Sequence, residues 1–251
     1  MSWTRTYDGV EPQRINKWLG QSGVCSRREA EGLIADGFVS IDGEVVTDAG
    51  RKILPGQTLT LSDDATGALD AAVTLMLHKP IGYVSGQPEP DKIPAVRLLT
   101  AANADDGSPD IPADASLPPI GRLDEDSRGL LLLSSDGVVA KAVIGPESDL
   151  PKEYMVRVAG EVTERKLALL RHGLSLDGRT LKPAEVTQLK PRRLRFILRE
   201  GRNRQIRRMC ELVGLEVTDL KRIRIGPLAL GDLAEGRWRM LTAEERGKLI
   251  G

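Results

Sequence analysis

The first part of the chain combines two helical patterns of apolar residues with short alternating ones. The segment 12–61 repeats its apolar side chains first at helical and then at strand spacing. Its second helix begins with a capping box, Ser26 to Glu29, and ends at Gly37. Asp42-Gly43 then predicts a tight hairpin turn between short strands. The pattern predicts a small unit of two helices and a hairpin.

The larger remainder of the chain carries more strand patterns than helical ones. Its clearest element is Leu130–Leu133, a continuous apolar run that predicts a strand buried on both faces. Helical spacing predicts helices over 163–172 and 203–213, and residues 174–189 predict a hairpin around Asp177-Gly178. Because the strands come as hairpins rather than regular strand–helix repeats, we expect an α+β fold with a mainly antiparallel mixed sheet.

Breaks in these patterns predict the domain boundaries. Residues 1–11 lack periodicity and predict a flexible tail, and the small polar segment 62–72 predicts a linker. The second domain then covers 73–251. Within it, residues 101–118 are rich in Ala, Asp and Pro and predict a long acidic surface loop or insertion.

Charge is balanced overall but locally uneven. The 251 residues contain 36 Lys and Arg and 36 Asp and Glu, so the protein is not basic throughout. Residues 190–208, however, hold nine Lys and Arg and the single acid Glu200. A basic stripe of this kind indicates a polyanionic partner.

Cysteine and histidine usage argues against disulfide scaffolds and zinc sites. Cys25 and Cys210 lie far apart and are expected to be small buried thiols in a reducing compartment. His78 and His172 are also isolated, so no zinc cluster is expected. A signal peptide and a transmembrane run are not recognisable, and we expect a cytoplasmic protein without membrane contact.

The most reactive-looking segment is the polar loop Gly121–Gly129, which directly precedes the buried strand. A strand that is fixed in the core can hold a preceding carboxylate firmly, which makes the acids of this loop, Asp124 among them, candidate reactive groups. Asp126 follows two residues later, and the two carboxylates together could instead hold a divalent metal, as in a nuclease or phosphatase. Asp136, which precedes Gly137, is expected to cap the next helix.

Four ordered segments resemble one enzyme family. They are SGVCSRREAE, PIGRLDEDSRGLLLLSSDG over 119–137, KEYMV over 152–156 and GRNRQIRRMCELVG. Together they resemble the pseudouridine synthases that act on ribosomal RNA and carry an attached S4 domain, and are most similar to the large-subunit type F. Four motifs in the expected order are far more specific than any one of them.

This resemblance implies an S4-like RNA-binding domain over 12–61 and a pseudouridine synthase domain over 73–251. The implied reaction breaks the bond between ribose C1′ and uracil N1, turns the base and rejoins it through C5. It is an isomerisation, so the resemblance implies neither a cofactor nor a metal.

The same resemblance implies roles for individual residues. Asp124 would act on the ribose, either by attacking C1′ or by removing a ribose proton. Arg207 would supply the cation opposite Asp124, and Tyr154 would stack on the target base and take its C5 proton. Ile206 would form the apolar floor beneath the base, and Arg122 would contact the RNA beside it.

Further basic residues would hold the RNA. Lys152, Arg204 and Arg208 are expected to contact the substrate, and we expect Arg204 and Arg208 to face outward toward phosphates. In the S4-like domain the expected RNA contacts are Arg14, Lys17, Arg27 and Arg28.

The target RNA and the class of function stay open at this level. A uridine of large-subunit ribosomal RNA or its precursor particle is the leading substrate, and a transfer RNA uridine is the alternative or additional one. A different class of protein, a non-catalytic RNA-binding or ribosome-assembly factor, would use only the S4-like domain and the basic helix. We expect the protein to act as a monomer.

Overall fold

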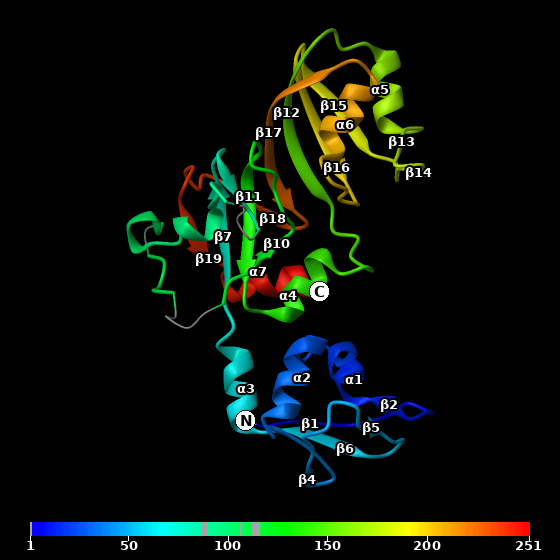
Figure 1. Cartoon of the computed structure of the whole chain (residues 1–251), viewed down its shortest axis with the longest axis vertical. Helices are drawn as coiled ribbons and strands as arrows, with labels where there is room; N and C mark the ends of the chain where they lie inside the picture. The colour runs from blue at the N-terminus through cyan, green and yellow to red at the C-terminus, as the bar shows by residue number, and fades with distance from the viewer. Residues whose placement is uncertain (1, 87–89, 106, 112–115) are drawn as a thin grey trace.

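The computed structural model describes residues 2–86, 90–105, 107–111 and 116–251, arranged as two domains. In Figure 1 the N-terminal domain, coloured blue, lies below the larger C-terminal one, and a single helix runs between them. The expected α+β architecture, with a small S4-like domain ahead of a larger one, is confirmed.

The N-terminal domain packs two helices against short strands. The helices are α1 (Ile15–Ser22) and α2 (Arg27–Ala35), and α2 begins with the expected capping box between Ser26 and Glu29. The strands are β1 (Trp3–Thr6), β2 (Gln13–Arg14), β3 (Val39–Ile41), β4 (Glu44–Val45), β5 (Lys52–Ile53) and β6 (Thr58–Leu61). One sheet has the order β1-β6-β3-β4, and β2 pairs with β5.

The expected flexible tail is instead part of this domain. Residues Trp3–Thr6 form β1, which pairs antiparallel with β6. Trp3 and Tyr7 both pack against the ring of Trp18, with ring centroids 6.1 and 5.5 Å away. Three aromatic side chains bury enough apolar surface to hold the segment in place, which a search for periodicity misses.

The segment expected to be a linker is also ordered. It forms α3 (Asp63–Asp70), in which the Ser62 hydroxyl caps the Ala65 amide and Asp63 and Asp64 occupy the first turn. These are favourable helix-start signals, and the buried side chain of Ala65 anchors the helix to the N-terminal core.

The C-terminal domain is built on one large sheet. Its strands follow the order β15-β16-β12-β17-β11-β7-β19, and only the β11–β17 pair on this path is parallel. The strands of this path are β7 (Thr74–Lys79), β11 (Arg128–Ser134), β12 (Lys152–Ala159), β15 (Glu185–Lys190), β16 (Arg193–Leu198), β17 (Glu216–Ile225) and β19 (Trp238–Met240). Two short strands, β10 (Pro119–Ile120) and β18 (Leu228–Ala229), pair with β11 and β17.

Helices cover this sheet in two places. Helices α5 (Glu164–Arg171) and α6 (Gln205–Leu212) pack on β12, β15 and β16, while α4 (Gly137–Ile144) and α7 (Ala243–Ile250) pack beside β7 and β11. The apolar run Leu130–Leu133 is fully buried within β11, as expected. Asp136 caps α4 through the amides of Val138 and Val139, also as expected.

The expected hairpin over 174–189 is divided. Only β13 (Ser175–Leu176) and β14 (Arg179–Thr180) pair around the turn, and β15 pairs with β16 instead. Pairing with β16 buries Val186 opposite Phe196, and this cross-strand contact fixes the register.

The remaining short elements lie between β7 and β10. They are β8 (Tyr83–Val84), β9 (Ile93–Pro94) and the 3₁₀ turns Ala95–Leu98 and Ala101–Asn103. Within the expected 101–118 insertion, the amide of Asp105 donates to the Trp238 carbonyl and Leu117 packs in the core. Residues 106 and 112–115 of this insertion lie outside the described residues.

The two domains contact each other through the first turn of α4. The Glu29 carboxylate, which already closes the capping box of α2, also accepts a hydrogen bond of 3.0 Å from the Gly137 amide. Lys141 of α4 donates in turn to the Gly20 carbonyl of α1 at 2.6 Å. A Cβ added at Gly137 would lie 2.4 Å from the Glu29 and Ser26 side chains. Glycine at this position therefore permits the close approach.

Replacing Gly137 with alanine should separate the two domains. The added methyl group cannot fit against Glu29, so both the Glu29 and Lys141 contacts should be lost. We expect a larger radius of gyration by small-angle X-ray scattering and faster proteolysis between residues 62 and 72. Gly32→Ala in α2, where an added Cβ meets nothing within 4 Å, is the control and should leave both readouts unchanged. A Gly137→Ala protein with the scattering curve of the wild type would contradict this account of the interface.

Candidate active site

The loop 121–127 connects β10 to β11 and is held by backbone hydrogen bonds on its outer side. The Ser85 hydroxyl donates to the Leu123 carbonyl at 2.8 Å and accepts from the Leu123 amide at 2.9 Å. The Gly82 amide donates to the Glu125 carbonyl at 2.9 Å. These contacts fix the backbone on both sides of Asp124.

A buried arginine holds the same loop from within. The Arg222 side chain is almost fully buried, and its Nε donates to the Leu130 carbonyl at 2.8 Å. Its guanidinium also donates to the carbonyls of Gly121 at 2.8 Å and Arg122 at 3.4 Å. Arg222 thus joins β17, β11 and the loop, and its charge is solvated by carbonyl oxygens rather than by an acid.

Strands β11 and β17 approach closely beside this arginine. Gly129 has φ +109°, and a Cβ at this position would lie 2.2 Å from the Arg222 carbonyl oxygen. Only glycine fits here, and this proximity brings the Arg222 side chain within reach of the loop.

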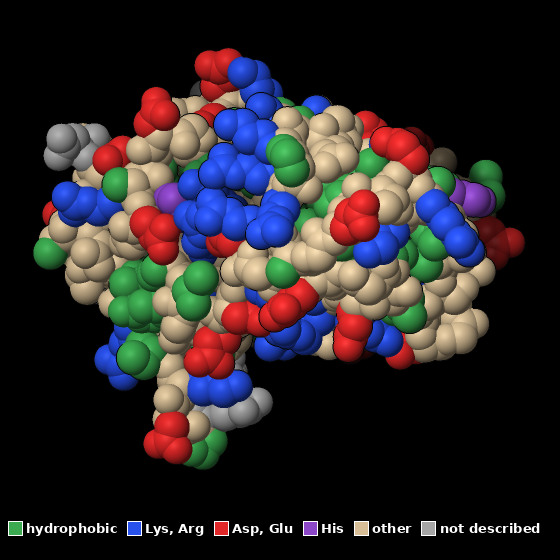
Figure 2. All heavy atoms as spheres, turned by 90° about the horizontal axis from the view of Figure 1, so that it is seen from above, with side chains coloured by type: hydrophobic (Ala, Val, Ile, Leu, Met, Phe, Trp, Pro, Cys, Tyr) green, Lys and Arg blue, Asp and Glu red, His purple; other side chains and the backbone are tan. Residues whose placement is uncertain are grey.

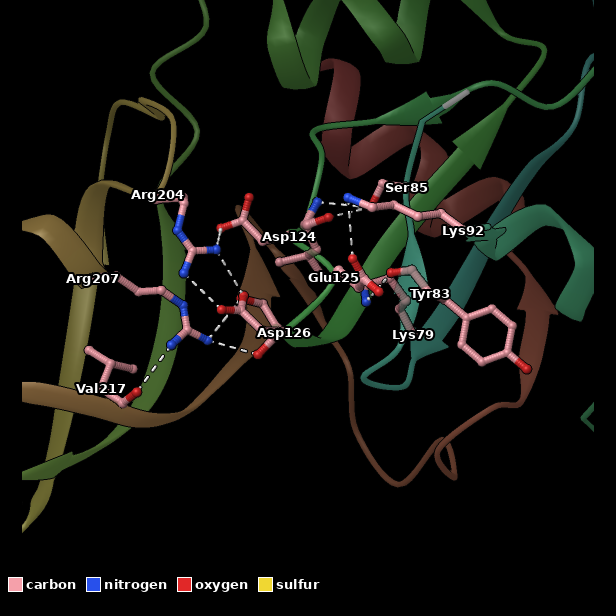
Figure 3. Close-up of polar contacts among 12 residues, drawn as sticks. Lys79, Tyr83, Ser85, Lys92, Asp124, Glu125, Asp126, Arg204, Arg207 and Val217 are labelled. Atoms are coloured by element: carbon pink, nitrogen blue, oxygen red, sulfur yellow. Dashed lines mark hydrogen bonds and ion pairs between the residues drawn. The ribbon is translucent and has the colours of Figure 1, made fainter. Parts of the chain in front are cut away.

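A buried lysine lies on the other side of the loop. Lys79, at the end of β7, donates to the carbonyls of Pro80 at 2.8 Å and Tyr83 at 2.7 Å. Burial lowers the pKa of Lys79 to about 8, although the negative charges of Asp126 and Asp124 oppose this shift. We call the loop 121–127 the acidic loop. In Figure 3 Lys79 and Ser85 lie on one side of it, and Arg204 and Arg207 on the other.

Two arginines hold the acidic loop on the side of α6. Arg204 binds the Asp126 carboxylate through both terminal nitrogens, at 2.8 and 3.2 Å, and its Nη1 lies 3.7 Å from Oδ2 of Asp124. Arg207 donates to the Asp126 backbone carbonyl at 2.7 Å and to the Val217 carbonyl at 3.1 Å. Burial alone would raise the pKa of Asp126, but the hydrogen bond from Arg204 and the charge of Arg207 leave it below its ordinary value.

The cation beside Asp124 therefore differs from the expected one. We expected Arg207 opposite Asp124 and Arg204 facing outward, whereas Arg204 turns inward to both carboxylates. Its backbone has left-handed dihedrals, φ 48° and ψ 33°, at the residue before α6. Such a conformation costs on the order of 1 kcal/mol for a side chain other than glycine, and it is typical of functional sites.

A cavity of about 790 Å³ lies between the loop and α6. It is lined by six of the residues expected at the site: Arg122, Asp124, Lys152, Tyr154, Arg204 and Ile206. Arg222 also lines it, and burial together with the charge of Arg222 lowers the pKa of Lys152. The Asp124 side chain is 31% exposed, so it faces the cavity from a partly enclosed position.

The structure does not bring Arg208 to this cavity. Arg208 binds the Asp177 carboxylate at 2.6 and 3.0 Å on the surface. Arg207 lies behind Asp126 rather than in the cavity wall. The four basic residues expected to bind RNA in the N-terminal domain, Arg14, Lys17, Arg27 and Arg28, are all exposed.

Asp124 and Asp126 do not form an obvious metal site. Both carboxylates face the guanidinium of Arg204, which already supplies a positive charge there. Among the described residues, no group of three or more His, Cys, Asp or Glu is placed to hold a metal ion. Cys25 and Cys210 are buried free thiols, as expected, and burial raises the pKa of each to about 12. Within the described ranges, no helix has the length and apolar content that a bilayer crossing requires.

Comparison with known proteins agrees with this arrangement. The family described as RNA pseudouridylate synthase matches residues 73–212, and the S4 domain matches residues 13–59. An RNA pseudouridine synthase of Aquifex aeolicus (strain VF5) is 35% identical over 243 residues, which cover 94% of this chain and 93% of that protein. The chain belongs to the RNA pseudouridine synthases.

Two further relatives extend over most of this synthase. The dual-specificity RNA pseudouridine synthase RluF of Escherichia coli (strain K12) is 34% identical over 234 residues, which cover 92% of this chain and 76% of that protein. A solved structure described as a pseudouridylate synthase aligns with a TM-score of 0.64 at 27% identity, over 94% of this chain and 99% of that one. The family expected from the four motifs is confirmed.

Three residues that hold the site of this synthase were not anticipated from the sequence: Lys79, Ser85 and Arg222. Each one acts through backbone carbonyls or amides, so no motif of reactive groups marks it. The sequence could have revealed Lys79 and Arg222 only through their positions within the strand patterns. Lys79 ends an apolar strand and Arg222 lies in an alternating one, and a charge at such a position requires a buried partner.

Replacing Arg222 with methionine should destabilise the synthase and loosen its acidic loop. The change leaves three carbonyl oxygens without their donor, which should cost roughly 2 kcal/mol or more in free energy of unfolding. Urea denaturation measures this loss. Arg224→Met on the same strand is the control, because the half-exposed Arg224 pairs with Glu153 at 3.3 Å, and Glu153 keeps its second partner Arg195, so the change should cost less than about 1 kcal/mol. Equal losses in the two variants would contradict the role assigned to Arg222.

Proposed function

We propose that this synthase isomerises a uridine of ribosomal RNA that is turned out of its helix into the cavity between the acidic loop and α6. The observation that carries the proposal is the joint exposure of Asp124, Tyr154 and Ile206 in one cavity of about 790 Å³. This volume is within the range that accommodates a small ligand, roughly 300–1,000 Å³.

In this proposal Asp124 acts on the ribose. Its carboxylate either attacks C1′ or removes a ribose proton, and in both cases the bond from C1′ to N1 breaks. The base then turns and C5 bonds to C1′ as the Asp124–C1′ bond breaks or, in the second route, as the ribose regains its proton; the C5 proton then leaves and N1 is protonated. Either role needs an ionised carboxylate, and the guanidinium of Arg204 lies 3.7 Å from Oδ2 of Asp124.

The cavity walls supply the contacts for the base and the phosphates. Tyr154 offers an aromatic face against which uracil can stack, and buried Ile206 offers an apolar floor. Arg122 and Lys152 line the same cavity and can bind the phosphates that flank the uridine. Turning the base outward costs a few kcal/mol, which these contacts and those of the S4 domain can offset.

A ribosomal target is supported by the S4 domain that precedes the catalytic domain and by the motifs shared with the large-subunit branch. A structured RNA presents the target in a helix whose shape a second domain can recognise. We further propose that the enzyme acts in the cytoplasm as a monomer.

Asp124→Asn should abolish isomerisation while preserving RNA binding. The amide keeps the shape of the side chain but can neither attack C1′ nor accept a proton, so turnover should fall at least a thousandfold. Tritium release from ribosomal RNA labelled at uridine C5 measures turnover, and filter binding measures affinity. Glu125→Gln, which keeps the shape of the neighbouring side chain and removes its exposed ion pair with Lys92, is the control and should keep wild-type turnover.

Two results would overturn the proposal. Turnover by Asp124→Asn at the wild-type rate would exclude Asp124 from the chemistry. A wild-type protein that binds ribosomal RNA but converts none of its uridines would instead indicate a non-catalytic RNA-binding factor.

A further inference from the structure

The sheet formed by β15, β16, β12 and β17 is covered by helices on one face only. α5 and α6 pack against the face that carries the buried residues Val156, Leu194 and Phe196. On the opposite face the described residues place no helix, and the side chains are half-buried or exposed. We call this second face the open sheet face. Its basic residues are Arg157, Arg193, Arg195, Lys221 and Arg224.

Cations on the open sheet face lie directly opposite one another. Arg157 of β12 pairs in register with Arg193 of β16, so the two side chains leave neighbouring strands only about 5 Å apart. Like charges in this arrangement destabilise a sheet. Neither arginine forms an ion pair with any residue in the described ranges. Asp219 of β17 lies opposite Arg157 on its other side and offsets part of this repulsion, but Arg128 already binds both of its oxygens. A bound anion would reduce the repulsion further.

Two acidic residues in the middle of this face already have basic partners, while Glu185 and Glu216 lie exposed toward its margins. Glu153 binds both Arg195, at 2.6 Å, and Arg224, at 3.3 Å. Asp219 is bound through both oxygens by Arg128 of β11, at 2.8 and 2.9 Å. Among the described residues, Arg157, Arg193 and Lys221 form no direct ion pair of their own, although the charge of Asp219 acts on Arg157 and Lys221, so all three side chains can still bind an anion.

This face lies on the other side of the sheet from the cavity. Tyr154 lies next to Met155 on β12 and Arg222 next to Lys221 on β17, and successive side chains of a strand point to opposite faces. Tyr154 and Arg222 line the cavity, so Met155 and Lys221 face away from it. The basic stretch 190–208 is thus divided, with Arg193 and Arg195 on the open sheet face and Arg202 and Arg204 at the cavity.

We propose that the open sheet face binds the phosphate backbone of a second segment of the RNA substrate, away from the uridine in the cavity. Figure 2, which views the molecule from the end that holds this sheet, shows Lys and Arg side chains gathered in one continuous band. This inference rests on the proposed function, because it takes a large folded RNA as the partner.

The chemistry of the face favours phosphates over bases and over protein. Its described residues include no aromatic side chain on which a base could stack. Apolar area is confined to half-buried side chains such as Met155 and Ile197, which is little for a stable protein interface. Arginines on a firm sheet suit the charge and spacing of an RNA backbone without reading its sequence.

The test compares the full-length wild type with the double variant Arg157→Gln/Arg193→Gln on two RNAs. One is a short stem-loop that carries the target uridine, and the other is a long ribosomal RNA fragment that also includes the flanking helices. The control is Arg97→Gln/Arg165→Gln, which removes the same charge from exposed positions on a 3₁₀ turn and on α5.

We expect the double variant to bind the long fragment at least tenfold more weakly at 0.1 M salt. The slope of the logarithm of its binding constant against the logarithm of the salt concentration should be shallower by roughly 1.5, because two phosphate contacts are lost. Its turnover on saturating stem-loop should equal that of the wild type, and the control should match the wild type in all three readouts.

Equal affinity and salt dependence in the double variant and the control would overturn the proposal. So would a variant that binds naked RNA normally but associates weakly with an assembling ribosomal particle, since the face would then bind protein. Binding is measured independently of turnover. A wild type that converts no uridine would contradict the proposed function, whereas unchanged binding in the double variant would contradict this inference.

Discussion

A buried guanidinium bound to backbone carbonyls organises the candidate active site of this synthase. Arg222 reaches from β17 to β11 and to the first residues of the acidic loop, and its three acceptors belong to the segment that carries Asp124. Taking such a charge out of water is costly unless its donors are satisfied. The loop therefore keeps the one conformation that satisfies them, which is a direct way to preorganise a reactive carboxylate.

The electrostatics of the loop follow from this fixed backbone. Once Asp124 and Asp126 are held close together, their negative charges require compensation, which Arg204 provides for both and Arg207 provides for Asp126. Arg204 adopts a left-handed backbone to reach them, and the ion pairs and hydrogen bonds that it gains offset the strain. Arg207 instead ties the loop to β17 through two carbonyls, which makes it a structural contact in the protein without RNA.

Local signals in the sequence predicted local structure, whereas long-range contacts had to be observed. The buried strand at Leu130–Leu133, the capping box at Ser26 and the helix cap at Asp136 each depend on a few neighbouring residues. Strand β1 depends on β6, a partner far along the chain, which periodicity does not reveal. At the site, motif resemblance located Asp124 and Tyr154 on one cavity, but the choice of Arg204 over Arg207 depends on one backbone conformation.

The central claim is that a uridine enters the cavity with its ribose at Asp124 and its base at Tyr154. A crystal structure of the enzyme with a stem-loop carrying 5-fluorouridine at the target position tests it most directly, because fluorine replaces the proton that C5 must lose. The account predicts the fluorinated base stacked on Tyr154 above Ile206, with ribose C1′ within about 3.5 Å of an Asp124 oxygen. A target nucleotide that stays within its helix, or lies outside this cavity, would contradict it.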